Sequence, residues 1–107
     1  MCFKKINFLG DSLDRIKGFP SDAKQEAGYQ LDRVQRGREP NDWKPFVDIG
    51  AGVKEIRIKE ASGAFRVMYV ASFAEFIYVL HAFQKKSQKT EKKDIDLAIK
   101  RYKEIRS

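Results

Sequence analysis

The chain of 107 residues is 42% hydrophobic and 12% aromatic, which fits one globular domain spanning residues 1–107 rather than a disordered chain. Its formal net charge of +7, from 22 Lys and Arg against 15 Asp and Glu, favours a polyanionic or acidic partner. The single cysteine, Cys2, and the single histidine exclude an internal disulfide and metal sites built from paired cysteines or histidines, so we expect an inert Cys2, no metal and no cofactor.

The first third of the chain predicts a short strand followed by two helices. The strand is predicted over residues 4–9, and Asp11 or Ser12 then caps a short helix that ends near residue 17. A second helix is predicted over residues 21–36. Its apolar residues fall on one face at helical spacing: Ala23, Ala27, Leu31 and Val34. The two helices are expected to pair as an αα-hairpin.

Residues 37–52 predict a loop, because Gly, Pro and Asn recur throughout this stretch. Trp43 and Phe46 are its large aromatic residues. Aromatic side chains in loops usually pack on the body of the protein. We therefore expect these two residues to anchor the loop rather than to stack on nucleic-acid bases.

The segment from residue 53 to residue 83 has the composition of consecutive antiparallel strands. Val, Ile, Tyr and Phe dominate three runs, at residues 53–59, 64–71 and 76–83. A basic polar segment follows at residues 84–90, and Thr90 is placed to cap a final helix. The apolar stripe of this helix contains Ile95, Ala98, Ile99, Tyr102 and Ile105. The helices are expected to cover the sheet.

The hairpin between the first two of these strands brings three cations together if residues 60–63 form a four-residue loop. Lys59 then faces Ala64, and Arg57 faces Arg66. Because opposed residues share a face of the sheet, Arg57, Lys59 and Arg66 lie on one side, away from the apolar face. Like charges placed opposite each other disfavour strand pairing. The arrangement therefore indicates either an anion-binding face or a solvated outer face on which the three cations splay apart.

Several motifs of enzymes and membrane proteins are missing from the sequence. It contains no GxxxxGK[ST] phosphate-binding loop, no GxGxxG, no HExxH and no GxSxG. It also shows no apolar core of a secretory signal, and its longest apolar stretches are too short to span a bilayer. We therefore expect a soluble, cytoplasmic protein with no membrane partner and no classical hydrolase machinery.

Three motifs occur in a fixed order along the chain: EIR at residues 55–57, GAFRVMY at residues 63–69, and VLHAFQKK at residues 79–86 followed by Thr90. The flanking segments FLGDSL (8–13), WKP (43–45) and DIDLA (94–98) accompany them. This series resembles the RelE/ParE superfamily of type II toxins, and most closely its phage-derived, HigB-like branch. The likeness covers nearly the whole chain.

The resemblance implies an α+β fold of RelE type, in which an N-terminal strand and a helical hairpin pack on a curved, mainly antiparallel sheet that also carries a C-terminal helix. It implies a toxin that cuts mRNA on the ribosome and so inhibits translation, which makes the ribosome and mRNA expected partners. It also implies a cognate antitoxin, expected to be a HigA-like helix-turn-helix protein, and contact with operator DNA only through that antitoxin.

The resemblance also assigns site residues. In RelE-like toxins two basic residues precede the G-x-[YF]-R motif, and they match Arg57 and Lys59 here, while the motif arginine matches Arg66. In the implied reaction the RNA 2′-hydroxyl attacks its own phosphate. Arg57 and Arg66 would hold that phosphate, and Lys59 is a candidate base if neighbouring cations depress its pKa. The predicted RNA-binding residues are Gln84, Lys85, Lys86 and Lys89.

His81 is the candidate acid or base by residue type. Strand alternation places it on an apolar face with Ile77, Val79 and Phe83, where a single histidine is more often a packed core residue than a catalyst. Tyr69 is expected in the core as well. RelE carries a substrate-stacking tyrosine in its C-terminal segment, and no tyrosine occurs here between residues 86 and 95.

Two other functions are compatible with the sequence. One is a ParE-like inhibitor of DNA gyrase that performs no nuclease chemistry, and the other is a non-toxic nucleic-acid-binding module. The basic trio favours a nuclease, because gyrase inhibition requires no cluster aimed at a phosphate. No helix shows the pattern of a recognition helix, which ranks the module last.

Overall fold

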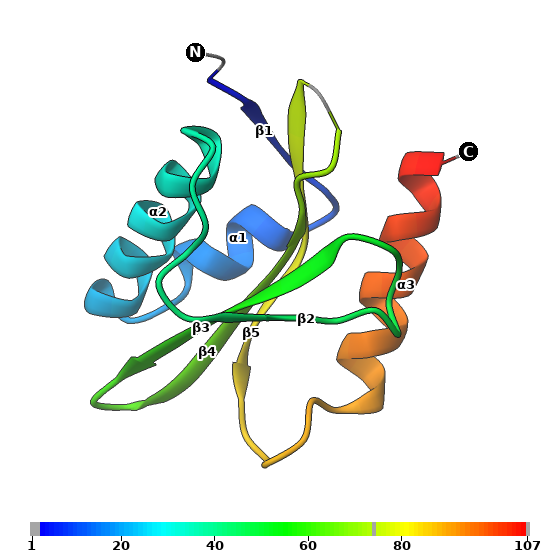
Figure 1. Cartoon of the computed structure of the whole chain (residues 1–107). Coiled ribbons are helices and arrows are strands. Elements are labelled where there is room, and N and C mark those ends of the chain that lie inside the picture. Colours follow the sequence, from blue (N-terminus) through cyan, green and yellow to red (C-terminus); the bar gives the residue numbers. More distant parts are fainter. Residues whose placement is uncertain (1–2, 74, 107) are drawn as a thin grey trace.

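The structure is a computed structural model that describes residues 3–73 and 75–106. The described chain forms a five-stranded sheet in the order β1-β5-β4-β3-β2, with three helices packed on it (Figure 1). The elements are β1 (Lys5–Phe8), α1 (Ser12–Lys17), α2 (Ser21–Gln35), β2 (Trp43–Pro45), β3 (Val53–Glu60), β4 (Gly63–Val70), β5 (Phe76–Lys85) and α3 (Lys92–Arg106). The predicted α+β class is confirmed. Cys2 lies outside the described residues, so its inertness stays a prediction.

The sheet separates two hydrophobic cores. Helices α1 and α2 cover one face, and α3 covers part of the other (Figure 1). The first core contains the predicted apolar face of α2 together with the alternating apolar residues of β3 and β4, including the fully buried Tyr69. The second contains the predicted stripe of α3, packed on Val53, Met68 and Val70. Both helix faces and the core position of Tyr69 are therefore confirmed.

The loop prediction for residues 37–52 is wrong in one respect, because it contains the short strand β2. This strand pairs antiparallel with β3, with Trp43 opposite Ile56. Three residues that include a proline are too short for a visible alternation of side chains, which is why the pattern missed them. The Trp43 ring packs under the Lys54 ammonium at 4.5 Å, and Phe46 packs against the second core. The expected anchoring role of both aromatics is therefore confirmed.

The β3–β4 register is the predicted one. Arg57 pairs with Arg66, and Lys59 pairs with Ala64. The turn itself is shorter than expected: Glu60 and Gly63 also pair, which leaves a loop of two residues. Gly63 has φ +148°, a conformation that favours glycine at the start of β4.

The predicted face of His81 is wrong because β5 contains a bulge. Met68 pairs with His81, but the next residue of β4, Tyr69, pairs with Val79, so Leu80 is the extra residue. The bulge reverses the alternation, and His81 shares its face with Phe83 and not with Val79. Strand β5 also runs two residues further than predicted, to Lys85, which pairs its end with Ala64.

Helix α3 is tied to the sheet by polar contacts that the sequence does not reveal. Arg101 is buried and donates from Nη1 to the Leu80 carbonyl at 2.9 Å and from Nη2 to Asp11 at 2.6 Å. Hydrogen bonds from Arg101 and then Arg15 lower the pKa of Asp11 to about 2. Thr90 is not the predicted cap: α3 begins at Lys92, and the Thr90 hydroxyl donates to Glu55.

No described helix has both the length and the apolar character needed to cross a membrane.

Two glycines provide an opposed pair of stability tests. A Cβ at Gly50 would lie 2.6 Å from the Tyr102 ring, whose hydroxyl is fixed by a hydrogen bond to the Ala51 carbonyl. A Cβ at Gly28, inside α2, would meet nothing within 4 Å. We expect Gly50→Ala to lower the free energy of unfolding by about 1–3 kcal/mol through overpacking. We expect Gly28→Ala to raise it by about 0.5–1 kcal/mol through helix propensity. Urea unfolding of both variants measures the two changes, and an equal response of the two would contradict the packing of α3 on this loop.

Candidate functional site

One end of the sheet face that carries α3 presents a ladder of cations across three strands. In the outermost row, Lys59 of β3, Ala64 of β4 and Lys85 of β5 are opposed. The small side chain of Ala64 separates the two lysines. The next row holds Arg57, Arg66 and Phe83. An open hollow lies over this end, lined by Ala64, Arg66, Lys85, Lys86, Ser87 and Gln88, and is called the cationic hollow below.

Arg66 forms the floor of the cationic hollow. It is 7% exposed, and its Nη1 donates to the Phe65 carbonyl at 3.0 Å. Its Nε lies 3.8 Å from Oε1 of the buried Glu55. Burial lowers the pKa of Arg66, and the charge of Glu55 opposes that shift. The guanidinium remains charged at any physiological pH, so the hollow has a fixed cation at its base.

Lys85 is the second cation of the hollow and is partly buried. Burial, followed by the charge of Arg66, lowers the pKa of Lys85 below its ordinary value of 10.5. Lys44 and Arg57 act in the same direction, and Glu55 opposes them. A lysine with a lowered pKa releases and accepts a proton more readily near neutral pH than an exposed lysine does.

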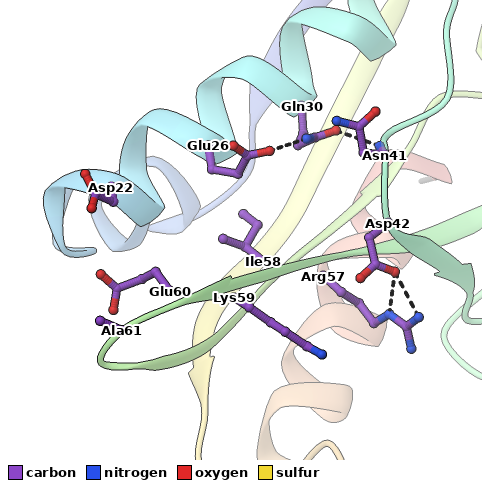
Figure 2. Close-up of a pocket in the computed structure, with 10 residues that line it drawn as sticks. All are labelled: Asp22, Glu26, Gln30, Asn41, Asp42, Arg57, Ile58, Lys59, Glu60 and Ala61. Atoms are coloured by element: carbon purple, nitrogen blue, oxygen red, sulfur yellow. Dashed lines mark hydrogen bonds and ion pairs between the residues drawn. The ribbon is translucent and has the colours of Figure 1, made fainter.

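Arg57 and Lys59 share the face of Arg66 by register, but their side chains border a different hollow at the free edge of β3 (Figure 2). Arg57 is held by Asp42, with Nη2 at 2.8 Å and Nε at 3.0 Å from the same oxygen. Lys59 extends away from α2 in this view and forms no ion pair with a described residue. The other charged residues here are carboxylates: Asp22, Glu26 and Glu60. This edge hollow is thus a poorer anion site than the cationic hollow.

His81 lies one row below Arg66, beneath α3, and is completely buried. Its Nε2 is 2.7 Å from Oδ1 of Asp94, and its ring stacks on Phe83 with centroids 5.1 Å apart. Nδ1 has no hydrogen-bond partner among residues 3–73 and 75–106. Burial lowers the pKa of His81, against the opposing hydrogen bond to Asp94. A substrate cannot reach this ring in the structure as it stands.

Residues 14–103 match the family described as Phage derived protein Gp49-like (DUF891). The chain belongs to this family. The Gp49-like family is a phage-derived, toxin-like group related to RelE, and it suggests an antitoxin partner for the chain. No curated protein matches the chain.

The remaining predicted RNA-binding residues of the Gp49-like protein fall in different places. Lys86 lines the cationic hollow and also a neighbouring hollow between β5 and α3. Gln84 points to the opposite side of β5 from Lys85, and its amide donates to the Ser62 carbonyl at 3.3 Å. Lys89 is exposed in the turn before α3 and does not line the cationic hollow. Of these residues, only Lys85 and Lys86 are joined with Arg66 in one site.

Two residues beside the cationic hollow were not among the predicted site residues, although both lie in segments that carry the family resemblance, EIR and WKP. Glu55 is fully buried next to Arg66, and Lys44 of β2 lies 3.7 Å from its carboxylate. Glu55 had a detectable signal, because it stands two residues before Arg57 and so shares the cationic face. Nothing in the sequence indicated that Lys44 faces Glu55, since β2 itself was not visible in the alternation of side chains.

His81 is the single histidine of the Gp49-like protein, so its protonation can be measured without overlap from other imidazoles. Because the pKa of His81 is lowered in the folded state, the unfolded chain binds a proton first as the pH falls. The contribution of neutral His81 to stability is therefore present above about pH 6.5 and lost below it. We expect an NMR titration of the imidazole to give a pKa below 6.5, and Asp94→Asn to lower it further. A wild-type pKa above 6.5 would show that Asp94 outweighs burial.

Proposed function

We propose that this Gp49-like protein is the toxin of a type II toxin–antitoxin system, of the HigB-like branch, and that it inhibits translation by cutting mRNA on the ribosome. The observation that supports this function best is the cationic hollow, which Arg66, Lys85 and Lys86 line together with the small side chain of Ala64. Arg57 and Lys59 extend the positive face along the next strand. The family supports the toxin function in general terms.

The reaction we propose uses the RNA itself as nucleophile. The 2′-hydroxyl oxygen forms a bond to the adjacent phosphorus, and the bond from phosphorus to the 5′-oxygen of the next nucleotide breaks. The phosphate gains negative charge in the transition state, so a fixed cation at its position accelerates the step. Arg66 has this place, since its Nη2 has no partner among the described residues and its planar fork matches phosphate oxygens.

Two protons must move in this reaction, one from the 2′-hydroxyl and one to the leaving 5′-oxygen. Lys85 is our candidate for the second transfer, because its lowered pKa and its place beside Arg66 let the ammonium give up a proton at the scissile phosphate. Lys59 stands in the same row across Ala64, although its side chain borders the edge hollow, and it is our candidate for the first transfer. Lys86 and Lys89 would contact the RNA backbone, and Gln84 a ribose or base edge. His81 would support the site from below without touching RNA.

The proposed partners follow from the charge of the protein and from its family. A chain of net charge +7 is attracted to ribosomal RNA and to an acidic antitoxin. We propose a HigA-like helix-turn-helix antitoxin that blocks the toxin and carries it to operator DNA. The whole chain, residues 1–107, is taken as one toxin domain in this proposal.

Induction in bacterial cells tests the proposed function directly. We expect growth arrest with early loss of amino-acid incorporation and with new 5′ ends in translated mRNA. Loss of DNA synthesis with DNA-damage signalling and intact mRNA would instead identify a gyrase inhibitor. Unchanged growth would favour a non-toxic binding module. Untranslated transcripts provide the internal control, because ribosome-dependent cleavage leaves them intact.

Substitutions at Arg66 separate charge from geometry. Arg66→Ala is expected to reduce mRNA cleavage by about 10²–10³-fold, the usual effect of removing one preorganised donor to a developing charge. Arg66→Lys keeps the charge but not the bidentate fork, and we expect it to recover only a small part of the activity. The measurement is the rate of cleavage of a ribosome-bound message by the purified variants.

Lys24→Ala is the matched control for loss of one positive charge. Lys24 is exposed on α2, on the far side of the sheet from the cationic hollow. This variant should cut mRNA at nearly the wild-type rate. Equal activity of Arg66→Ala and Lys24→Ala, with both proteins folded, would remove Arg66 from the mechanism.

A further inference from the structure

Glu55 is a carboxylate buried directly beneath the most positive part of a basic protein. It is the first residue of the EIR motif, and its side chain is 0% exposed. By register it occupies the row below Arg57 and Arg66, on the same face of β3. A fully buried charge is costly unless it is paired, so its presence here requires an explanation.

The pairing of Glu55 is incomplete. Its Oε1 lies 3.8 Å from Nε of Arg66 and 3.7 Å from Nζ of Lys44, both too long for a hydrogen bond. Its Oε2 accepts one from the Thr90 hydroxyl at 3.3 Å. Within the described part of the chain, Glu55 Oε1 and Arg66 Nε have no hydrogen-bond partner. Two buried polar atoms of opposite charge thus face each other unbonded.

Stability does not explain this arrangement. Apolar residues of similar volume often replace buried ion pairs with no loss of stability, and a loosely bonded pair contributes even less than a tight one. The charge of Glu55 does act on the cations of the site, because it opposes the lowered pKa of both Arg66 and Lys85. It lies nearest the Nε edge of Arg66, while Nη1 donates to the Phe65 carbonyl, so Nη2 is the guanidinium nitrogen that neither contact occupies.

We propose that Glu55 is a positioning residue, which holds the guanidinium of Arg66 in the orientation that receives a phosphate in the cationic hollow. Glu55 itself touches no substrate, since it has no exposed surface. Thr90 orients the carboxylate by its hydrogen bond to Oε2. The proposal rests on the role of Arg66 in the proposed function, because the phosphate is that of RNA.

Positioning and simple electrostatics predict opposite outcomes when the charge of Glu55 is removed. Glu55→Gln keeps the size of the side chain and its acceptor for Thr90, but it makes the hollow more positive by one unit. The field alone would then strengthen phosphate binding. If Glu55 orients Arg66, the same substitution weakens binding in spite of the added positive charge.

The test is a titration of the purified full chain with inorganic phosphate at constant ionic strength, followed by NMR on the Nε–Hε groups of its arginines. The Arg66 signal is identified by its absence in Arg66→Lys. In the wild type we expect this signal to shift on addition of phosphate. In Glu55→Gln we expect roughly fivefold weaker binding and a broadened Arg66 signal.

Glu60→Gln is the control for charge. Glu60 is at the end of the same strand and borders the other hollow, so this variant makes the same change in net charge away from Arg66. It should bind phosphate as the wild type does or slightly more tightly. Tighter binding by both variants, with an unchanged Arg66 signal, would overturn the positioning role.

A second variant covers the case in which Glu55→Gln does not fold. Thr90→Ala removes the hydrogen bond to Glu55 and changes no charge, so it should weaken phosphate binding by a smaller factor. Thr90→Ser restores the hydroxyl and should restore the affinity. Equal phosphate binding by the wild type, Thr90→Ala and Thr90→Ser would also overturn the proposal.

RNA cleavage then separates this inference from the proposed function. We expect Glu55→Gln to keep its affinity for ribosomes and to lose cleavage rate, because the remaining cations still attract RNA. If the wild type does not cut RNA but the phosphate results are as expected, the proposed nuclease activity is rejected and the positioning role of Glu55 still holds. If the Arg66 signal of the wild type does not shift on addition of phosphate, the positioning role is rejected even if RNA is cut.

Discussion

The register of β3 against β4 is the constraint on which both the core and the site depend. Side chains alternate between faces along a strand, so a slip by one residue would move every side chain of β3 to the other face. Ile56 and Ile58 would leave the α2 side of the sheet, and Glu55 and Arg57 would enter it. The two buried isoleucines therefore fix the position of the cations. Loss of apolar burial and burial of unpaired charges both oppose the slip, which lets the sheet tolerate Arg57 opposite Arg66.

The position of α3 determines which part of the other sheet face is buried and which part stays open. Its apolar stripe covers the rows around Val53, Met68 and Val70, and its first turn reaches His81 through Asp94. Beyond that row α3 no longer covers this face, and the strand ends carry Arg57, Lys59, Arg66 and Lys85 beside Phe83 and Ala64. The same sheet face is thus core at one end and an open cationic surface at the other. The buried polar row of Glu55 and His81 forms the boundary between them.

Strong periodicity in the sequence predicted the parts of this fold that depend on it. The α2 face, the α3 stripe and the β3–β4 hairpin each repeat over many residues, and the structure has them where the pattern places them. The pattern gave the wrong prediction where a single residue or a very short segment determines the local structure. Leu80 is a single bulged residue that turns His81 from one face to the other, and β2 is only three residues long. The candidate site was predictable to the same extent. Alternation placed Arg57 and Arg66 on one face, but it did not show that Arg57 pairs with Asp42 while Arg66 lies beside Glu55.

The positive charges of this protein divide into two groups that respond differently to salt. Exposed lysines such as Lys59, Lys86 and Lys89 act through water, and physiological salt screens them beyond a distance of about 8 Å. Arg66 is mostly buried beside Glu55, where screening is weak and an interaction with a bound phosphate is strong. The first group can bring a polyanion to the surface from any direction, but it cannot fix the geometry of one phosphodiester. Arg66 is better suited to that, because it is mostly buried and its Nη1 is bonded to the Phe65 carbonyl. In the proposed function, attraction of RNA and its cleavage therefore depend on different cations of the same sheet face, and each can be changed without the other.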